Sequence, residues 1–164
     1  MRMRNGDRVQ RLEQVFEQFP GVRFNIDPKS KAALAPLIRL LQQAPGLVER
    51  VCLGSFETEK LRELRSTLPS VATSLGGSEI RRLVLAVRTG RRFSWPAQVV
   101  ATQIPPAALG IRILTRQFVD FVTAAGRQVH VWTVDDPSEM HRYYDLGVSA
   151  VMTDRPSVLK QVLQ

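Results

Sequence analysis

The first third of the chain alternates between helical and extended patterns of hydrophobic residues. Between residues 7 and 19, apolar residues recur at spacings of three and four, which predicts a helix with one apolar stripe. After Pro20, residues 22–27 alternate between apolar and polar, which is the period of a strand. Pro28 opens a second predicted helix, whose buried stripe comprises Ala33, Leu34, Leu37, Ile38 and Leu41.

The same order of strand and helix repeats along the rest of the chain. Further strands are predicted at residues 50–56, 71–75, 99–104, 128–134 and 148–152. Further helices are predicted at residues 57–68, 78–87 with Ser78 as N-cap, 116–125, and from Asp136 and Pro156 onward. Pro45-Gly46, residues 90–96 and Pro105-Pro106 are expected loops. Strict alternation with short loops predicts a parallel sheet covered by helices, an α/β fold.

A doubly wound open sheet is the usual α/β architecture for a chain of 164 residues. Such a sheet usually carries a glycine-rich phosphate-binding turn after an early strand. The sequence contains no G-x-G-x-x-G motif and no P-loop, and Gly76-Gly77 is too short to replace them. The pattern therefore favours a parallel α/β fold without a nucleotide-binding turn.

Composition places the chain among globular proteins, because 44% of its residues are hydrophobic and 23% are charged. No apolar run approaches the roughly 18 residues of a membrane span, and the first residues lack the apolar core of a signal peptide. We therefore expect no transmembrane segment and a cytoplasmic location. The single Cys52 lies in an apolar run, and one cysteine forms neither an internal disulfide nor a CxxC metal site. A buried core thiol is expected.

The net charge of +8 could attract nucleic acid, anionic lipid or phosphorylated substrates. Arginine supplies nearly all the positive charge and is spread along the chain, whereas nucleic-acid binding usually shows a clustered face and a recognisable module. A generally basic surface without a nucleic-acid role is therefore favoured. One exception stays open as a nucleic-acid contact, because five arginines gather on or after one predicted helix: Arg81, Arg82, Arg88, Arg91 and Arg92.

Polar residues interrupt the strand at residues 22–27, where a sheet covered on both sides should be apolar. Asn25, Asp27 and Lys29 are spaced two residues apart, so they share a face and form a ladder toward the carboxyl end of the strand. A buried unpaired charge is costly, so the ladder needs a metal, a counter-charge or water. Carboxyl ends of parallel strands are where α/β folds place their sites. An Asp27–Lys29 ion pair near the surface is the structural alternative.

Other predicted strands also end in polar or aromatic residues, which suggests one shared rim: Ser55, Ser74, Gln103, Trp132, Asp135 and Asp154. His130 shares a face with Trp132 and is expected to be packed or hydrogen-bonded, and His141 is expected on the surface. The sequence contains no G-x-S-x-G elbow, no H-E-x-x-H, and no cluster of histidines and carboxylates with metal-ligand spacing. The residues alone therefore point to a rim without a complete catalytic constellation.

Three segments resemble the glycerophosphodiester phosphodiesterase family. Residues 129–156, VHVWTVDDPSEMHRYYDLGVSAVMTDRP, resemble the carboxy-terminal signature of that family, in which WTV and an acidic or amide residue precede a helix, a glycine and a TD-x-P turn. FNIDPK at residues 24–29 is similar to the strand ending in an acidic-x-Lys motif, and GSF at residues 54–56 to the strand that follows it. The three segments occur in the family's order, and the resemblance covers nearly the whole chain.

The resemblance implies a (β/α)8 barrel of the phospholipase C-like phosphodiesterase type. It also implies metal-dependent hydrolysis of glycerophosphodiesters to glycerol 3-phosphate and an alcohol, with Mg²⁺ or Ca²⁺ as the divalent cation. Asp27 takes the position of a metal-ligating Glu, and Lys29 that of the catalytic lysine facing the substrate phosphate. Trp132 matches a rim tryptophan against the glycerol moiety, and Gln103 and Ser55 are further substrate-binding candidates.

The resemblance also implies what this sequence does not contain. Family members begin with a strand ending in His-Arg-Gly, then a strand with Glu-x-Asp and a His-Asp element, and nothing here matches these motifs. An eight-unit barrel takes about 250 residues. We therefore expect a single incomplete domain at residues 1–164, with about six of eight units, lacking the first two strands. This truncated chain is expected to be inactive alone.

An alternative is a non-catalytic binding or assembly module. Six units leave two exposed strand edges, and exposed edges tend to pair with another chain. A partner or a second copy could complete the barrel by such pairing, which would make self-association the expected behaviour.

Overall fold

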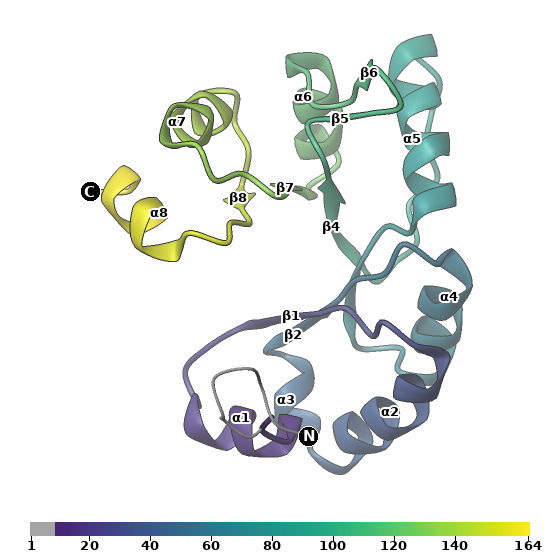
Figure 1. Cartoon of the computed structure of the whole chain (residues 1–164). Coiled ribbons are helices and arrows are strands. Elements are labelled where there is room, and N and C mark those ends of the chain that lie inside the picture. Colours follow the sequence, from purple (N-terminus) through teal and green to yellow (C-terminus); the bar gives the residue numbers. More distant parts are fainter. Residues whose placement is uncertain (1–8) are drawn as a thin grey trace.

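Six parallel strands form the central sheet of the computed structural model, which describes residues 9–164 (Figure 1). Their order in the sheet is β1-β2-β3-β4-β7-β8, the same as their order in the chain. Their bounds are β1 Phe24–Ile26, β2 Val51–Leu53, β3 Ala72–Ser74, β4 Val99–Ile104, β7 Gln128–Val131 and β8 Ala150–Val151. Each pair of neighbours is parallel, so the predicted parallel α/β sheet is confirmed.

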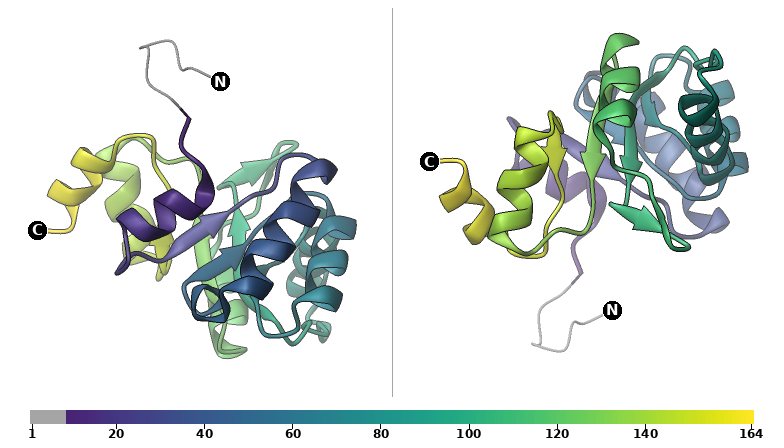
Figure 2. Two further views of the ribbon diagram at one scale, coloured as in Figure 1. Left: turned by 90° about the horizontal axis from the view of Figure 1, so that it is seen from below. Right: turned by 90° about the horizontal axis from the view of Figure 1, so that it is seen from above.

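Helices connect each strand of the central sheet to the next, while α1 precedes β1 and α8 follows β8. Their bounds are α1 Leu12–Gln18, α2 Leu34–Gln43, α3 Pro45–Val48, α4 Thr58–Thr67, α5 Gly77–Thr89, α6 Arg116–Ala124, α7 Pro137–Asp145 and α8 Pro156–Val162. A 3-10 turn, η1 at Lys31–Ala33, precedes α2. Figure 2 shows α2, α4 and α5 grouped along one side, with α7 and α8 next to β7 and β8. No helix of residues 9–164 is both long enough and apolar enough to cross a membrane.

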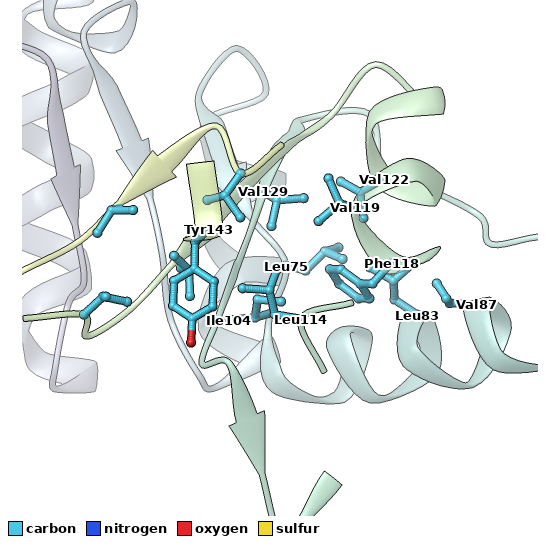
Figure 3. Close-up of a cluster of buried hydrophobic side chains, with 14 of the residues drawn as sticks. Leu75, Leu83, Val87, Ile104, Leu114, Phe118, Val119, Val122, Val129 and Tyr143 are labelled. Carbon is cyan, nitrogen blue, oxygen red and sulfur yellow. The ribbon is translucent and has the colours of Figure 1, made fainter. Parts of the chain in front are cut away.

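Two clusters of buried side chains pack between the sheet and the helices. The first cluster lies under β1, β2, α2 and α4 and comprises Phe16, Leu34, Leu37, Ile38, Leu41, Val51, Leu53, Leu61, Leu64, Leu68 and Val71. The second cluster, shown in part in Figure 3, joins β4, β7, α5, α6 and α7, with Leu83, Ile104, Phe118, Val129 and Met140 among its fully buried members. The predicted stripe of the second helix is buried in the first cluster, except for the half-buried Ala33.

Helix starts follow the sequence signals in one case and depart from them in another. Asp136 caps α7, because its Oδ1 accepts a 3.0 Å hydrogen bond from the Glu139 backbone N–H. The predicted cap at Ser78 is wrong. α5 begins at Gly77 with Gly76 as its N-cap, two residues before Ser78, and Glu79 Oε2 accepts the Gly76 N–H at 2.8 Å.

The loop predicted at Pro45-Gly46 is helical instead, and one hairpin was not predicted at all. Pro45 starts the short helix α3, since its fixed φ suits the first helical position. After Pro105-Pro106, a two-stranded antiparallel hairpin forms from β5 (Ala107–Ala108) and β6 (Ile111–Arg112). The helix predicted to start at Asp7 begins at Leu12 in the described part of the chain, and residues 7 and 8 lie outside it.

Candidate functional site

Side chains on one face of the sheet meet across strands that are not neighbours. Gln103 Nε2 on β4 donates a 2.8 Å hydrogen bond to Asn25 Oδ1 on β1, although β2 and β3 lie between them. In a flat sheet these strands would be roughly 14 Å apart, at about 4.8 Å per spacing. The sheet therefore curves toward this face, as part of a barrel wall does.

A glycine keeps this concave face open. Gly54 follows β2, and a Cβ atom there would lie 2.7 Å from Gln103 Oε1 and 3.3 Å from Ser74 Oγ. The 2.7 Å distance is shorter than real Cβ atoms show, so a side chain at position 54 would displace the end of Gln103 that reaches Asn25. Gln103 and Ser74 thus face inward, as the predicted rim requires.

His130 on β7 continues this polar face, because it lies in register with Gln103 on the neighbouring strand. His130 Nε2 is 2.9 Å from Gln128 Oε1, so the imidazole is hydrogen-bonded, as predicted for it. Burial lowers the pKa of His130 below its ordinary value of 6.5, because desolvation disfavours the imidazolium. The imidazole is therefore neutral near pH 7.

Burial also raises the pKa of the Cys52 thiol to about 11, which makes this thiol unreactive.

Asp27 and Lys29 lie just beyond the end of β1 and form an ion pair. Lys29 Nζ is 2.5 Å from Asp27 Oδ2. The Lys29 side chain is 83% exposed and the Asp27 side chain 31% exposed. The pair matches the structural alternative raised by the sequence, and it also leaves an exposed ammonium at the carboxyl end of a strand. An ammonium in this place can bind a phosphate group.

A buried lysine holds the segment that carries this pair. Lys60 on α4 is only 7% exposed, and its Nζ donates hydrogen bonds to the carbonyl oxygens of Pro28 at 3.2 Å and Lys29 at 3.0 Å. The same Nζ is 2.7 Å from Glu57 Oε1. Its charge is thus fully satisfied, and the backbone at Lys29 is fixed to α4.

Ser55 belongs to the same set of contacts. Ser55 Oγ accepts a 3.1 Å hydrogen bond from the Glu57 backbone N–H, which fixes the start of α4. Through Glu57 and Lys60, Ser55 is therefore connected to the backbone of Lys29. The sequence interpretation missed Lys60. A signal was present, since residues 60, 64 and 68 share one helical face and Leu64 and Leu68 are apolar.

Trp132 lies against an aromatic residue from a distant strand end. Its ring and that of Phe56 are perpendicular, with centroids 5.3 Å apart. Phe56 follows β2 and Trp132 follows β7, and Phe56 is 67% exposed. The two rings thus bring together strand ends that are separated by β3 and β4. This arrangement supplies an apolar wall in which Phe56 is exposed and Trp132 is half-buried.

Asp135 and Asp154 take part in hydrogen bonds that hold a local turn. Asp135 Oδ1 accepts hydrogen bonds from Thr153 Oγ1 at 2.7 Å and from the Asp154 backbone N–H at 2.9 Å. These contacts tie the end of β7 to the turn before α8. Asp135 therefore fixes a turn, and Asp154 is exposed and contributes its backbone.

The residues of the described part do not form a metal site by themselves. No group of three or more His, Cys, Asp or Glu side chains within residues 9–164 is placed to hold a metal ion. Mg²⁺ and Ca²⁺ need six or more oxygen ligands, water included. Asp27 offers one carboxylate, and Lys29 already binds it. The described side chains thus do not fit a closed divalent cation site.

The sequence matches the model of the Glycerophosphoryl diester phosphodiesterase family over residues 2–158. The chain belongs to this family. A relative from Mycobacterium tuberculosis, named "Probable glycerophosphodiester phosphodiesterase 2", is 34% identical over 162 residues, which cover 96% of this chain and 61% of the relative. The chain thus spans less than two thirds of the length of this relative.

Solved structures of family members confirm the fold. A glycerophosphodiester phosphodiesterase from Parabacteroides distasonis superposes with a TM-score of 0.69 at 20% identity, covering 99% of this chain and 68% of that one. A phosphodiesterase from Oleispira antarctica, solved in complex with the product sn-glycerol-3-phosphate, superposes with a TM-score of 0.66 at 19% identity. That match covers 92% of this chain and 58% of the other. The curved six-stranded sheet is therefore part of the barrel expected from the sequence.

Proposed function

We propose that this chain supplies the phosphate-facing part of a glycerophosphodiester phosphodiesterase site. The observation that carries the proposal is the Asp27–Lys29 pair, with its 83% exposed lysine at the end of β1. Lys60 fixes the backbone of Lys29 from the buried side, so the ammonium is presented from a rigid segment. A phosphate oxygen can replace the Asp27 carboxylate as the partner of Lys29, since both are anionic acceptors.

Other rim residues support a glycerophosphodiester as the substrate. We assign the Trp132–Phe56 wall to the carbon face of a glycerol moiety, because this wall is apolar and its Phe56 ring is exposed to solvent. Gln103 is assigned to a glycerol hydroxyl, with its amide held by Asn25. Ser55 supports α4 and Lys60, which makes it a positioning residue for Lys29.

We further propose that residues 1–164 alone do not turn over substrate. Hydrolysis of a phosphodiester needs a general acid and base, and a metal-dependent enzyme also needs a Lewis acid on the phosphoryl oxygens. Asp27 is our candidate ligand for Mg²⁺ or Ca²⁺, but the described residues offer no three-donor group to complete its site. Assay of the purified chain with glycerophosphocholine and either cation should show no hydrolysis. Turnover that Asp27→Ala abolishes would contradict this part of the proposal.

Binding of sn-glycerol 3-phosphate tests the substrate assignment without turnover. Titration calorimetry should detect binding that Lys29→Gln weakens about tenfold or more, since a hydrogen bond to a charged group contributes about 1.5–3 kcal/mol. Lys31→Gln is the matched control, because Lys31 is exposed two residues further along the same segment. Equal affinities for Lys29→Gln and Lys31→Gln would refute the assigned role of Lys29.

A second candidate function is a binding or assembly module. In the described part of the chain, β1 pairs only with β2 and β8 pairs only with β7, so each outer edge has free backbone groups. Such edges tend to pair with another strand. We propose that a second chain can pair there. Light scattering that shows a stable monomer at high concentration would exclude pairing of these edges with a second copy of this chain.

A further inference from the structure

The positive charge of the protein is concentrated in one stretch of sequence. Residues 80–119 contain seven arginines and no aspartate or glutamate, whereas the rest of the chain contains 16 basic and 15 acidic residues. This stretch therefore carries nearly all of the net charge of +8. It includes α5 from Ile80 onward, the β5–β6 hairpin and the start of α6.

The hairpin in this stretch presents apolar residues to solvent. Leu109 at its tip is 98% exposed, which is far more than any other large hydrophobic residue described as exposed. Ala107, Ala108 and Ile111 are also exposed. A turn needs no leucine for its own stability, so these side chains are available for an apolar partner.

The backbone conformation at position 109 also disfavours leucine. Leu109 has φ of 51° and Gly110 has φ of 74°, and both follow β5 in a two-residue turn. Positive φ at both positions strongly favours Asn-Gly or Asp-Gly. Leucine is disfavoured there, and it gains nothing from packing within the protein. The tip thus combines conformational strain with exposed apolar surface, a combination that marks functional segments.

The hairpin and the arginines form one surface. Arg88, near the end of α5, donates through Nη2 to the Arg112 carbonyl on β6 at 3.4 Å. Arg91 and Arg92 follow the same end of α5, and Leu85 is exposed on that helix. Figure 1 shows β5 and β6 beside the ends of α5 and α6. We call this the basic hairpin surface, comprising Leu85, Arg88, Arg91, Arg92 and residues 107–112.

We propose that the basic hairpin surface docks the protein on an anionic lipid bilayer. An apolar tip gains free energy by entering the acyl region, and arginines around it are attracted to anionic head groups. Nucleic acid fits this surface less well, because its phosphates suit the arginines but an aliphatic tip neither stacks on bases nor forms hydrogen bonds. The proposal does not depend on the proposed enzymatic function, since it concerns a surface rather than the phosphate site.

Vesicle flotation tests this proposal with the full chain. The protein should float with vesicles of equimolar phosphatidylglycerol and phosphatidylcholine, and added salt should reduce flotation by screening. Leu109→Asn should lower the partition coefficient about tenfold, because it removes the apolar tip while keeping a residue that accepts positive φ. The double change Arg91→Gln and Arg92→Gln should lower it about twenty-five-fold, at about fivefold for each charge.

Matched variants separate this surface from general properties of the protein. Leu163→Asn changes another exposed leucine, and Arg23→Gln with Arg39→Gln removes two other exposed arginines. These controls should change partition less than about twofold. Absence of flotation at low salt, or equal flotation of wild type and Leu109→Asn, would overturn the proposal. Binding to a single-stranded DNA oligonucleotide without vesicle flotation would also overturn it and would identify nucleic acid as the partner.

Discussion

Gln103 Nε2 donates a hydrogen bond to Asn25 Oδ1 across two intervening strands, at a distance of 2.8 Å. This contact exists because the sheet curves and because Gly54 has no side chain to block it. It connects the first and fourth strands of the sheet on the concave face. The same curvature brings the ends of the strands toward one rim, where the candidate site lies.

Gly54→Ala should therefore remove the Asn25–Gln103 hydrogen bond. The new methyl group would displace the flexible end of Gln103, so we expect a loss of about 1 kcal/mol in the free energy of unfolding. Gln103→Ala should cost about the same, and the double variant should cost little more than either single one. Urea denaturation measures all three. Gly21→Ala, at a position with open space and no positive φ, should be close to neutral, and additive costs of Gly54→Ala and Gln103→Ala would contradict the coupling.

Arg65 and Glu79 form a buried ion pair between the two hydrophobic clusters. Arg65 on α4 bonds to both Glu79 oxygens on α5, at 2.7 and 3.0 Å, and also to Thr73 Oγ1 and the Ser74 carbonyl. Removing one partner of a buried pair leaves an uncompensated charge. Arg65→Ala should thus lower the free energy of unfolding by about 3–5 kcal/mol.

The exposed pair Arg62–Glu59 on the same helix is the control for this prediction. Arg62→Ala should cost no more than about 1 kcal/mol, since exposed ion pairs contribute little.

We propose further that both clusters unfold together as one domain, so that Arg65→Ala shifts a single transition in urea. Two separate transitions, only one of them moved, would show that the clusters are independent.

Lys60 is expected to hold the Asp27–Lys29 segment in place. Lys60→Met keeps most of the side-chain length but leaves the carbonyls of Pro28 and Lys29 without their donor, which should cost about 1–3 kcal/mol. Amide hydrogen exchange at residues 27–31 should become faster in this variant. Lys31→Met is the control, and unchanged exchange in Lys60→Met would show that other contacts fix the segment.

His130 should make the protein less stable as the pH falls. Its pKa in the folded protein is lowered by burial, so the unfolded chain takes up the proton first as the pH drops through about 6.5. The stability contribution is present above that pH and is lost below it. Thermal unfolding at pH 7.5 and pH 5.5 should show a smaller difference in His130→Asn than in wild type. His141→Asn changes an exposed histidine on α7, and an equal effect of the two substitutions would argue against His130 as the cause.

Strongly periodic segments were predictable because a single element decides their pattern. The apolar stripe of α2 and the Asp136 cap of α7 are local features, and both are present in the structure. The start of α5 was not predictable in the same way. The N-cap of α5 is Gly76, which has no side chain to accept the backbone N–H of Ser78. Thr58 Oγ1 on α4 accepts this N–H at 3.2 Å, so a residue from another helix takes the place of a cap side chain.

The candidate site was only partly visible in the sequence. Asp27 and Lys29 stood out because charges interrupt an apolar strand, and they are indeed paired. Lys60 did not stand out, since a lysine in a helix is usually exposed, and only its contacts with the backbone of another segment reveal its role. The β5–β6 hairpin was also missed, because Leu109-Gly110 lacks the asparagine or aspartate that marks such turns.

The sequence by itself determined the order of strands and helices, the parallel sheet and the family. Those properties follow from the local period of apolar residues and from short motifs, because both are formed by residues close together in sequence. Only the tertiary structure decided that Asn25 meets Gln103, that Phe56 meets Trp132, and that Arg88 of α5 contacts the β5–β6 hairpin. These relationships depend on how far the sheet curves and how loops fold back, and both result from the packing of many residues that are distant in sequence.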